Sequence, residues 1–129
     1  EREIARLGLE AACKGCAVAN GIEGNFDWLG GYPALVNDPA ATAVASDAAI
    51  AVLGKESVVA MTVPSMGGED FSYYLQRVPG AFWFLNSHNP DKGIIYPNHH
   101  PRFNIDEDVL DTMIAVNLAA AEALAQSIR

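Results

Sequence analysis

Two loop motifs hold the side chains best suited to chemistry, and the first is Asn98-His99-His100-Pro101. It lies in an irregular stretch, residues 86–104, that contains all three histidines and precedes the last predicted helix. Adjacent residues of an extended backbone point to opposite sides, so at most one of the two imidazoles is expected to face a given site. The spacing alone favours a simple interpretation, with one histidine hydrogen-bonded and the other solvated. The loop by itself lacks the three or four ligands of a zinc site.

The second motif is the segment 65–71, SMGGEDF, which lies between a predicted strand and a predicted helix. Its paired glycines, Gly67 and Gly68, let a backbone approach a ligand closely, and the start of the next helix offers free N–H groups to an anion. The segment lacks the Lys-Ser/Thr ending of a phosphate-binding loop and the spaced glycines of the dinucleotide fingerprint. Glu69 and Asp70 could form an acid/base pair, but capping of the helix is the favoured interpretation.

Cys13 and Cys16 form a lone C-x-x-C motif. A redox pair needs its first cysteine at a helix N-terminus, where the dipole lowers the thiol pKa, but Cys13 is expected at the other end of a helix. A zinc knuckle needs a second pair of ligands at suitable spacing. The favoured interpretation is two small, mostly buried thiols that flank a helix-to-strand turn. So few cysteines indicate a reducing compartment, and a cytoplasmic location is expected.

The elements that must position these motifs alternate along the chain, which predicts an α/β fold in two packing units that divide near residue 38. A helix is expected to stop at Gly15, and Asp38-Pro39 is a conventional helix start. Asn104 and Glu107 have capping-box spacing before the last helix. Apolar spacing predicts helices over residues 1–14, 38–53, 70–77 and from 104 or 106 to the C-terminus, and strands over 16–22, 57–63 and 81–85.

Composition excludes several classes of protein. Half of the 129 residues are hydrophobic, too many for a disordered chain. With a net charge of −8, the chain does not attract a phosphate backbone or an anionic membrane electrostatically, so neither nucleic acid nor membrane is expected as a partner. No apolar run reaches the roughly 18 residues of a membrane-spanning helix, and no signal peptide is visible at the N-terminus.

Three segments carry a resemblance to a known family. Residues 66–75 (MGGEDFSYYL), followed by 78–82 (VPGAF), are similar to the C-terminal region of the zinc-type amidohydrolases. This family includes N-acyl-amino-acid amidohydrolases, hippurate hydrolase, auxin-conjugate hydrolases and carboxypeptidase-like metallopeptidases. Residues 99–103 (HHPRF), followed by 105–107 (IDE), resemble the family's closing motif, and 32–38 (YPALVND) resemble its lid-to-core junction. The three motifs stand in family order with family spacing.

The resemblance implies a catalytic domain with a two-metal site and a smaller lid domain inserted into its sequence. This chain resembles the second half of the α/β lid over residues 1–37 and the last part of the α/β catalytic domain over 38–129. By alignment of the His-x-Pro pattern, His99 falls on a metal ligand of the family and His100 on a position that tolerates other residues. The loop at Gly67 and Gly68 resembles a wall of the substrate pocket. The general base and most metal ligands belong to family regions that this chain does not resemble, so no catalytic residue is expected in it.

The chemistry implied is hydrolysis of the amide bond of an N-acyl amino acid or a small peptide. In an intact relative, two divalent metals, zinc or manganese, about 3.5–4 Å apart activate a water and polarise the carbonyl, and a carboxylate base transfers the proton. We expect this chain to be a C-terminal fragment that is inactive alone and binds no metal tightly. The alternatives are a non-enzymatic association module with an exposed edge strand, or a subunit completed by an N-terminal partner chain. Apolar faces left uncovered favour association, so a homo-oligomer is expected.

Overall fold

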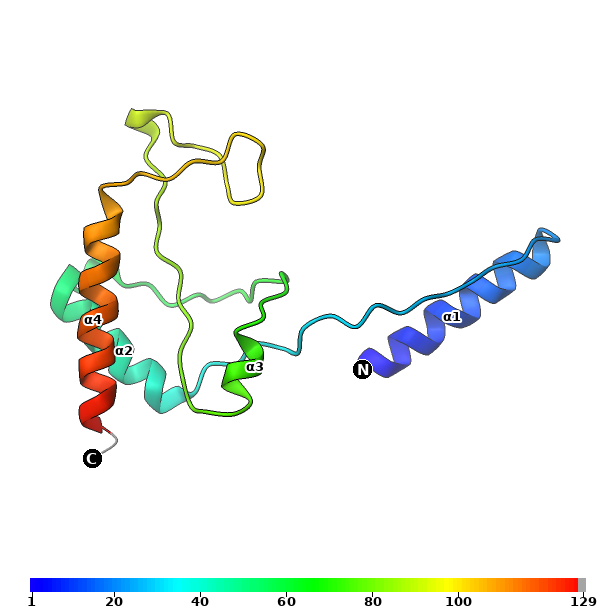
Figure 1. The fold of residues 1–129 in the computed structure, drawn as a ribbon, viewed down its shortest axis with the longest axis horizontal. Coiled ribbons are helices and arrows are strands. Elements are labelled where there is room, and N and C mark those ends of the chain that lie inside the picture. The colour runs from blue at the N-terminus through cyan, green and yellow to red at the C-terminus, as the bar shows by residue number, and fades with distance from the viewer. Residues whose placement is uncertain (128–129) are drawn as a thin grey trace. The chain divides into compact units, whose positions relative to one another are not determined.

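The computed structural model describes residues 1–127 of the chain. It consists of two compact units, of which the first is Glu1–Gly31 and the second begins at Tyr32. The helices of both units can be followed in Figure 1. The division lies six residues before the predicted one at residues 37 and 38, and it does not test the assignment of either unit to a lid or a catalytic domain.

Unit 1 is a single helix with a returning segment. Helix α1 (Arg2–Ala19) carries a ladder of ion pairs on its polar face, in which Arg6 bridges Glu3 and Glu10, and Lys14 pairs with Glu10. Residues 22–31 then run back along the helix (Figure 1). This returning segment lies closest to the helix at Gly24, where an added Cβ would lie 2.8 Å from the Cβ of Ala17.

The predicted helix end at Gly15 and the predicted strand over residues 16–22 are wrong. Gly15 lies inside α1, which continues through the next apolar turn to Ala19. The stop comes from the following pair of residues. The Asn20 side chain donates to the Cys16 carbonyl over 2.8 Å, and Gly21 takes the left-handed conformation, with φ 64°.

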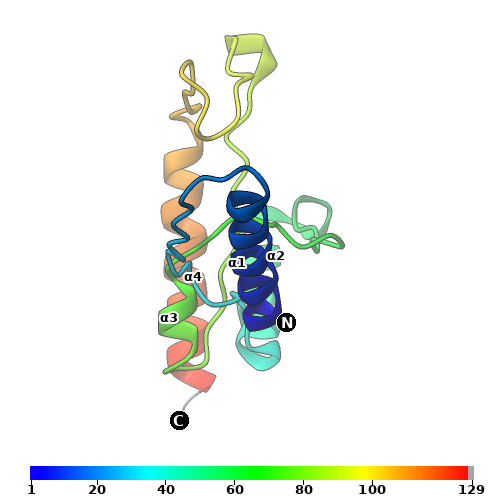
Figure 2. The same ribbon diagram turned by 90° about the vertical axis from the view of Figure 1, so that its right-hand side faces the viewer.

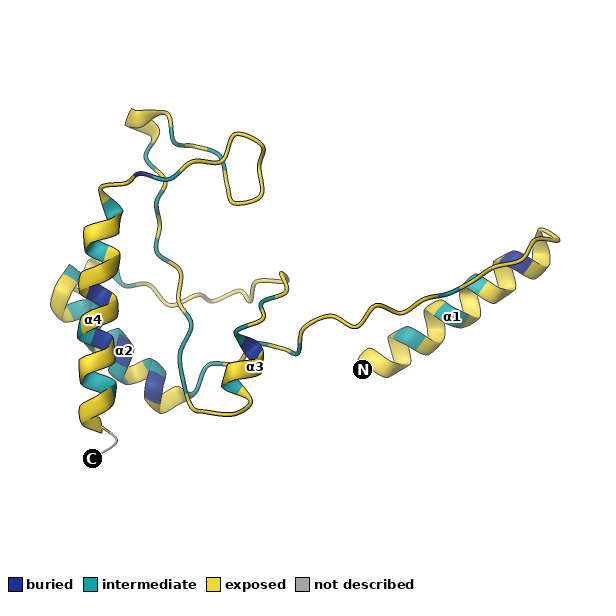
Figure 3. Cartoon of the chain, viewed as in Figure 1, coloured by how far each residue is buried: buried dark blue, intermediate teal, exposed yellow. Residues whose placement is uncertain are grey.

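Unit 2 is organised around two helices, α2 (Pro39–Leu53) and α4 (Val109–Ser127), which pack against each other. Their contact is made of small side chains, so the two backbones approach closely. Figure 3 shows the buried positions of both helices where they meet. The buried core residues of the pair are Ala41, Ala45, Val116 and Ala120.

The predicted start and end of the second helix are confirmed. An Asp38 side-chain oxygen accepts from the Ala41 amide over 2.8 Å, and Pro39 occupies the first helical turn. The helix ends at Gly54, whose φ of 81° suits a residue without a Cβ. The signals at both ends of this helix are therefore local in sequence.

No β-strand occurs within residues 1–127, so the strands expected over 57–63 and 81–85 are not present in the structure. The single bridge is an isolated antiparallel pair, Asn89 and Ile94. A strand becomes part of a sheet only when a neighbouring strand supplies hydrogen bonds, and the described chain offers these two apolar segments no such neighbour. An α/β sheet is therefore not confirmed by this structure.

The remaining helices are shorter than predicted or begin later. Helix α3 (Ser72–Leu75) covers only the middle of the expected 70–77 helix, and two 3-10 turns, η1 (Lys55–Ser57) and η2 (Pro90–Lys92), lie in the connections. The predicted capping box before α4 is wrong, because Asn104 accepts from its own neighbour Ile105. The chain first makes a turn at Asp106, whose side chain accepts from the Asp108 amide over 3.3 Å.

Helix α4 is the one helix among the described residues that is long and apolar enough to cross a bilayer, judged by length and composition. The core helix of a soluble protein passes the same test, so this is weak evidence for a membrane span. In unit 2, α4 packs on α2. The loops of residues 86–108 precede α4 and extend beyond the N-terminal end of this helix in both views (Figures 1 and 2).

Candidate functional site

His99 lies exposed in the loop between η2 and α4, in an unusual backbone conformation. Its φ is 69°, in the left-handed region that residues with a Cβ seldom occupy. The Asn98 side chain accepts from the His99 amide over 3.1 Å, and the Asn98 amide nitrogen lies 3.4 Å from His99 Nε2. The imidazole therefore projects from a tight turn in which the neighbouring side chain already contacts it.

His100, in contrast to His99, stacks on the ring of Tyr96. The two rings lie 4.3 Å apart between centroids, with an interplanar angle of 11°. His100 Nδ1 accepts from the Arg102 amide over 3.0 Å, and the Arg102 guanidinium donates to the Tyr96 hydroxyl over 3.2 Å. Both imidazoles are exposed, and they differ in their contacts: His100 stacks on Tyr96, whereas within residues 1–127 His99 contacts only Asn98. The two residues lie in a turn and not in an extended backbone, so this difference does not come from the alternation expected along a strand.

The described residues do not form a complete metal site at this loop. Within residues 1–127 no three side chains of His, Cys, Asp or Glu lie close enough together to hold a metal ion. The exposed His99 imidazole has the donor chemistry that zinc or manganese accepts. A tight site needs two or three further ligands, and these residues do not provide them.

An open hollow of about 450 Å³ lies beside the turn, and Asn98 contributes to its wall. The lining combines aromatic and aliphatic side chains with several amides and His88. The residues that line it are 84–88, 94–98, 103 and 104. His99 itself does not line this hollow.

The glycine loop lies before α3, and its two glycines differ in their surroundings. Neither Gly67 nor Gly68 has a positive φ. A Cβ at Gly68 would lie 3.0 Å from the Tyr32 ring, whereas one at Gly67 would lie 3.5 Å from the Ser65 hydroxyl. Close approach is therefore required only at Gly68, and the group that approaches it is the Tyr32 side chain.

Of the two acidic residues after the glycines, Glu69 contacts the residues at the start of α3 through its side chain, and the Asp70 side chain makes no such hydrogen bond among residues 1–127. A Glu69 carboxylate oxygen accepts from the Phe71 amide over 3.1 Å, and the buried Ser72 hydroxyl donates to the Glu69 carbonyl over 2.6 Å. Asp70 is exposed. These contacts give Glu69 a local structural role at the start of the helix. No hydrogen bond, ion pair or ring contact among residues 1–127 joins this loop to His99.

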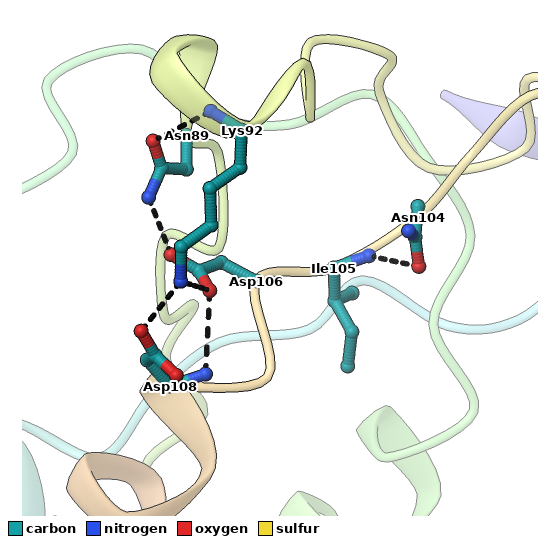
Figure 4. A network of polar contacts seen from close by, with 6 residues as sticks. All are labelled: Asn89, Lys92, Asn104, Ile105, Asp106 and Asp108. Carbon is teal, nitrogen blue, oxygen red and sulfur yellow. Dashed lines mark hydrogen bonds and ion pairs between the residues drawn. The ribbon is translucent and has the colours of Figure 1, made fainter.

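A polar network that the sequence did not reveal holds the chain before α4 (Figure 4). Lys92 Nζ contacts Asp106 over 2.6 Å and also reaches Asp108, while the Asn89 amide donates to Asp106 over 2.6 Å. The Lys92 ammonium, and after it the Asn89 amide, hold the pKa of the Asp106 carboxyl below its usual range. The Asp106 carboxylate, followed by Asp108, raises the pKa of Lys92.

This network fixes the two ends of the segment that carries His99. Asp106 is buried, and its amide donates to the Ser87 carbonyl over 3.1 Å. Lys92 and Asp106 are 14 residues apart, so only the folded loop brings them together. The one local signal was the turn-forming run 89–93, NPDKG, in which Asn89 caps η2.

The expected arrangement of the cysteines is wrong. Both lie inside α1, where Cys16 is exposed and Cys13 is half-buried, with its thiol 3.7 Å from the Asn25 carbonyl. They do not flank a helix-to-strand turn, because the helix continues past them.

Known proteins match this chain over most of its length. The model of a protein family described as peptidase family M20/M25/M40 matches residues 9–123. A putative amidohydrolase, YhaA, of Bacillus subtilis is 38% identical over 93% of this chain and 30% of its own length. Thermostable carboxypeptidase 1 of Saccharolobus solfataricus is 47% identical over 61% of this chain and 19% of its own length.

A third relative, N-acetyl-L-cysteine deacetylase of Bacillus subtilis, is 36% identical over 73% of this chain and 21% of its own length. The chain thus spans between 19% and 30% of the length of these relatives. No solved structure matches it. Because the family match covers residues 9–123 and the shared motifs lie within it, this chain belongs to peptidase family M20/M25/M40.

Proposed function

We propose that this chain is the C-terminal portion of a metal-dependent amidohydrolase that cleaves the amide bond of N-acyl amino acids or small peptides. In the complete site His99 is one ligand of a two-metal centre of zinc or manganese, and Gly67 and Gly68 form part of the substrate pocket wall. By itself the chain is inactive and holds no metal tightly.

One observation carries the proposal: the family match extends over nearly the whole chain, while the chain spans at most 30% of the length of the three relatives described above. Those relatives are named as a carboxypeptidase, an amidohydrolase and a deacetylase. Hydrolysis of an amide bond is the reaction we infer from these names for the protein to which this sequence belongs.

The geometry at His99 supports its role as a ligand. Its side chain is exposed and projects from a turn, whereas His100 is stacked on Tyr96. A single imidazole binds a divalent metal weakly, because strong sites combine three or four ligands. The further ligands would have to come from the parts of the family that this chain does not cover.

The two units support a proposed division into lid and catalytic parts. We assign residues 1–37 to the second half of a lid and 38–129 to the end of a catalytic domain, and the contact boundary between Gly31 and Tyr32 lies close to this division. Large apolar side chains remain exposed in both units, among them Ile4, Val18 and Phe84. Such surfaces favour association, so we propose a homo-oligomer, and the two free cysteines favour a cytoplasmic location.

The test is a graft. The matched 120-residue segment of YhaA is replaced by the corresponding residues of this chain, and the graft, YhaA and the isolated chain are assayed on a panel of N-acyl amino acids and dipeptides with added Zn²⁺ or Mn²⁺. We expect the graft to hydrolyse the substrates that YhaA hydrolyses, and the isolated chain to hydrolyse none.

Metal-dependent turnover by the pure isolated chain would overturn the proposal that it is inactive alone. A folded graft without activity, beside an active YhaA, would instead favour the non-enzymatic association module. Mixing the chain with the remaining part of YhaA as a separate polypeptide distinguishes the third possibility, because a subunit completed by a partner would recover activity on mixing.

A further inference from the structure

The backbone of His99 is held in a conformation that its residue type does not prefer. It is the one non-glycine residue with a positive φ within residues 1–127. A residue with a Cβ keeps such a conformation only when the surrounding contacts over-determine it. The contacts that do so can be identified on both sides of His99.

Backbone hydrogen bonds define the turn itself. The His100 amide donates to the Pro97 carbonyl over 3.1 Å, and the Phe103 amide donates to the His100 carbonyl over 2.9 Å. Asn98 accepts from the His99 amide. These bonds are short-range and lie in an exposed segment, so water can replace each of them.

The ring stack of His100 on Tyr96 adds a contact between the residues that precede and follow His99. Arg102 completes it, because its amide donates to His100 Nδ1 and its guanidinium donates to the Tyr96 hydroxyl and lies 5.8 Å from the ring centroid. Tyr96 is half-buried, whereas His100 and Arg102 are exposed, so the tyrosine is the anchored member of this cluster.

We propose that Tyr96 is a positioning residue for His99, acting through the imidazole of His100 stacked on its ring. The stack closes the turn and keeps His99 in its left-handed conformation. His100 thus supports the turn and does not bind the metal itself. That the turn matters for metal binding rests on the proposed function, in which His99 is a metal ligand.

The direct test is nuclear magnetic resonance on the 129-residue chain. A positive φ brings the amide hydrogen and the Hα of the same residue close together, so His99 should show a strong intraresidue cross-peak between them. Tyr96→Phe keeps the ring and should keep this cross-peak. Tyr96→Leu should reduce it to the averaged intensity of a flexible loop.

His100→Ala gives a second test that leaves Tyr96 in place, in case Tyr96→Leu fails to fold, and it should weaken the cross-peak in the same way. Helical circular dichroism of each variant checks that α2 and α4 are intact. A His99 cross-peak that is unchanged in both Tyr96→Leu and His100→Ala, or lost in Tyr96→Phe, would overturn the proposal.

The graft into YhaA separates this inference from the proposed function. Tyr96→Leu in the graft should raise the metal concentration for half-maximal activation roughly tenfold, with turnover at saturating metal nearly unchanged. An unchanged metal requirement in a graft that His99→Ala inactivates would overturn the positioning role alone. Full activity of the His99→Ala graft would overturn the ligand role of His99, whatever the cross-peak shows.

Discussion

The side-chain amide of Asn37 pairs with both backbone groups of Phe82. Its nitrogen donates to the Phe82 carbonyl and its oxygen accepts from the Phe82 amide, each over 2.8 Å. Next to it, the Asp38 amide donates to the Gly80 carbonyl over 2.9 Å. This reproduces the paired hydrogen bonds of an antiparallel ladder with a side chain in place of a strand, and it joins the start of α2 to a segment 45 residues later.

Asn37→Ala should therefore destabilise unit 2. Both residues are half-buried, and the substitution leaves the amide and the carbonyl of Phe82 without their partner. We expect a loss of about 1–3 kcal/mol in the free energy of unfolding, measured by urea denaturation. Gln76→Ala is the matched control, since Gln76 is exposed and its side chain makes no hydrogen bond in the described part of the chain. The urea midpoint of this variant should equal that of the wild type. An equal stability of both variants would contradict the role of Asn37.

Asp38→Ala removes the N-cap of α2 and should cost about 1 kcal/mol. The lost contact is the hydrogen bond from the Ala41 amide to the Asp38 carboxylate. Asp38→Ser should retain most of the stability, because a hydroxyl can accept the same bond. Asp47→Ala, an exposed position inside the same helix, removes a carboxylate without removing a cap. Thermal melting followed by circular dichroism at 222 nm ranks the three variants, and a loss in Asp47→Ala as large as in Asp38→Ala would contradict this account.

The Lys92–Asp106 pair predicts how stability depends on pH. The pKa of Asp106 is lower in the folded chain than in the unfolded one, so the pair stabilises the fold above about pH 4 and the contribution is lost as the pH falls through the folded pKa. The pKa of Lys92 is raised, so its contribution is present below about pH 10 and is lost at higher pH.

Urea midpoints of wild type and Lys92→Met between pH 2 and pH 8 test this dependence. The two should differ at neutral pH and converge in acid, where Asp106 is protonated. Lys55→Met is the control, because Lys55 is exposed and forms no ion pair among residues 1–127. A difference between wild type and Lys92→Met that persists unchanged to pH 2 would contradict the electrostatic origin of the effect.

The two glycines of the glycine loop, Gly67 and Gly68, should respond differently to an added side chain. A Cβ at Gly68 would lie 3.0 Å from the Tyr32 ring, so Gly68→Ala must displace that ring, while Gly67→Ala has room at 3.5 Å. Ring resonances of Tyr32 report the displacement directly. In the YhaA graft, Gly68→Val should raise KM more than Gly67→Val does; the reverse order would show that the Tyr32 contact does not determine which glycine matters.

Helix α2 could be predicted from sequence because all of its signals are local. An acidic cap, a proline in the first turn and a glycine at the end each act within one turn of the helix, and Asp38 and Gly54 do so in the structure. The end of α1 was predicted wrongly because two glycine signals compete. Gly15 is tolerated inside the helix, and Asn20 with Gly21 provides the actual stop.

Neither the absence of the expected strands within residues 1–127 nor the presence of the polar network could be predicted, because both depend on partners distant in sequence. An apolar run such as 81–85 has the composition of a buried strand, but whether it joins a ladder depends on what lies beside it. In this structure the backbone of Phe82 is satisfied by the Asn37 side chain. Likewise, no periodicity connects Lys92 to Asp106. The His99 assignment came from the resemblance of its motif and stays a prediction.

The most direct test of the central claim is the metal content of two variants of the YhaA graft. The claim is that His99, and not His100, ligates the metal of an M20 amidohydrolase. His99→Ala should abolish activity and reduce the metal bound at equilibrium, measured by titration calorimetry with Zn²⁺. His100→Ala should keep most of the activity at saturating metal. If His100→Ala is the inactive, metal-depleted variant and His99→Ala stays active, the assignment of the ligand is wrong by one residue.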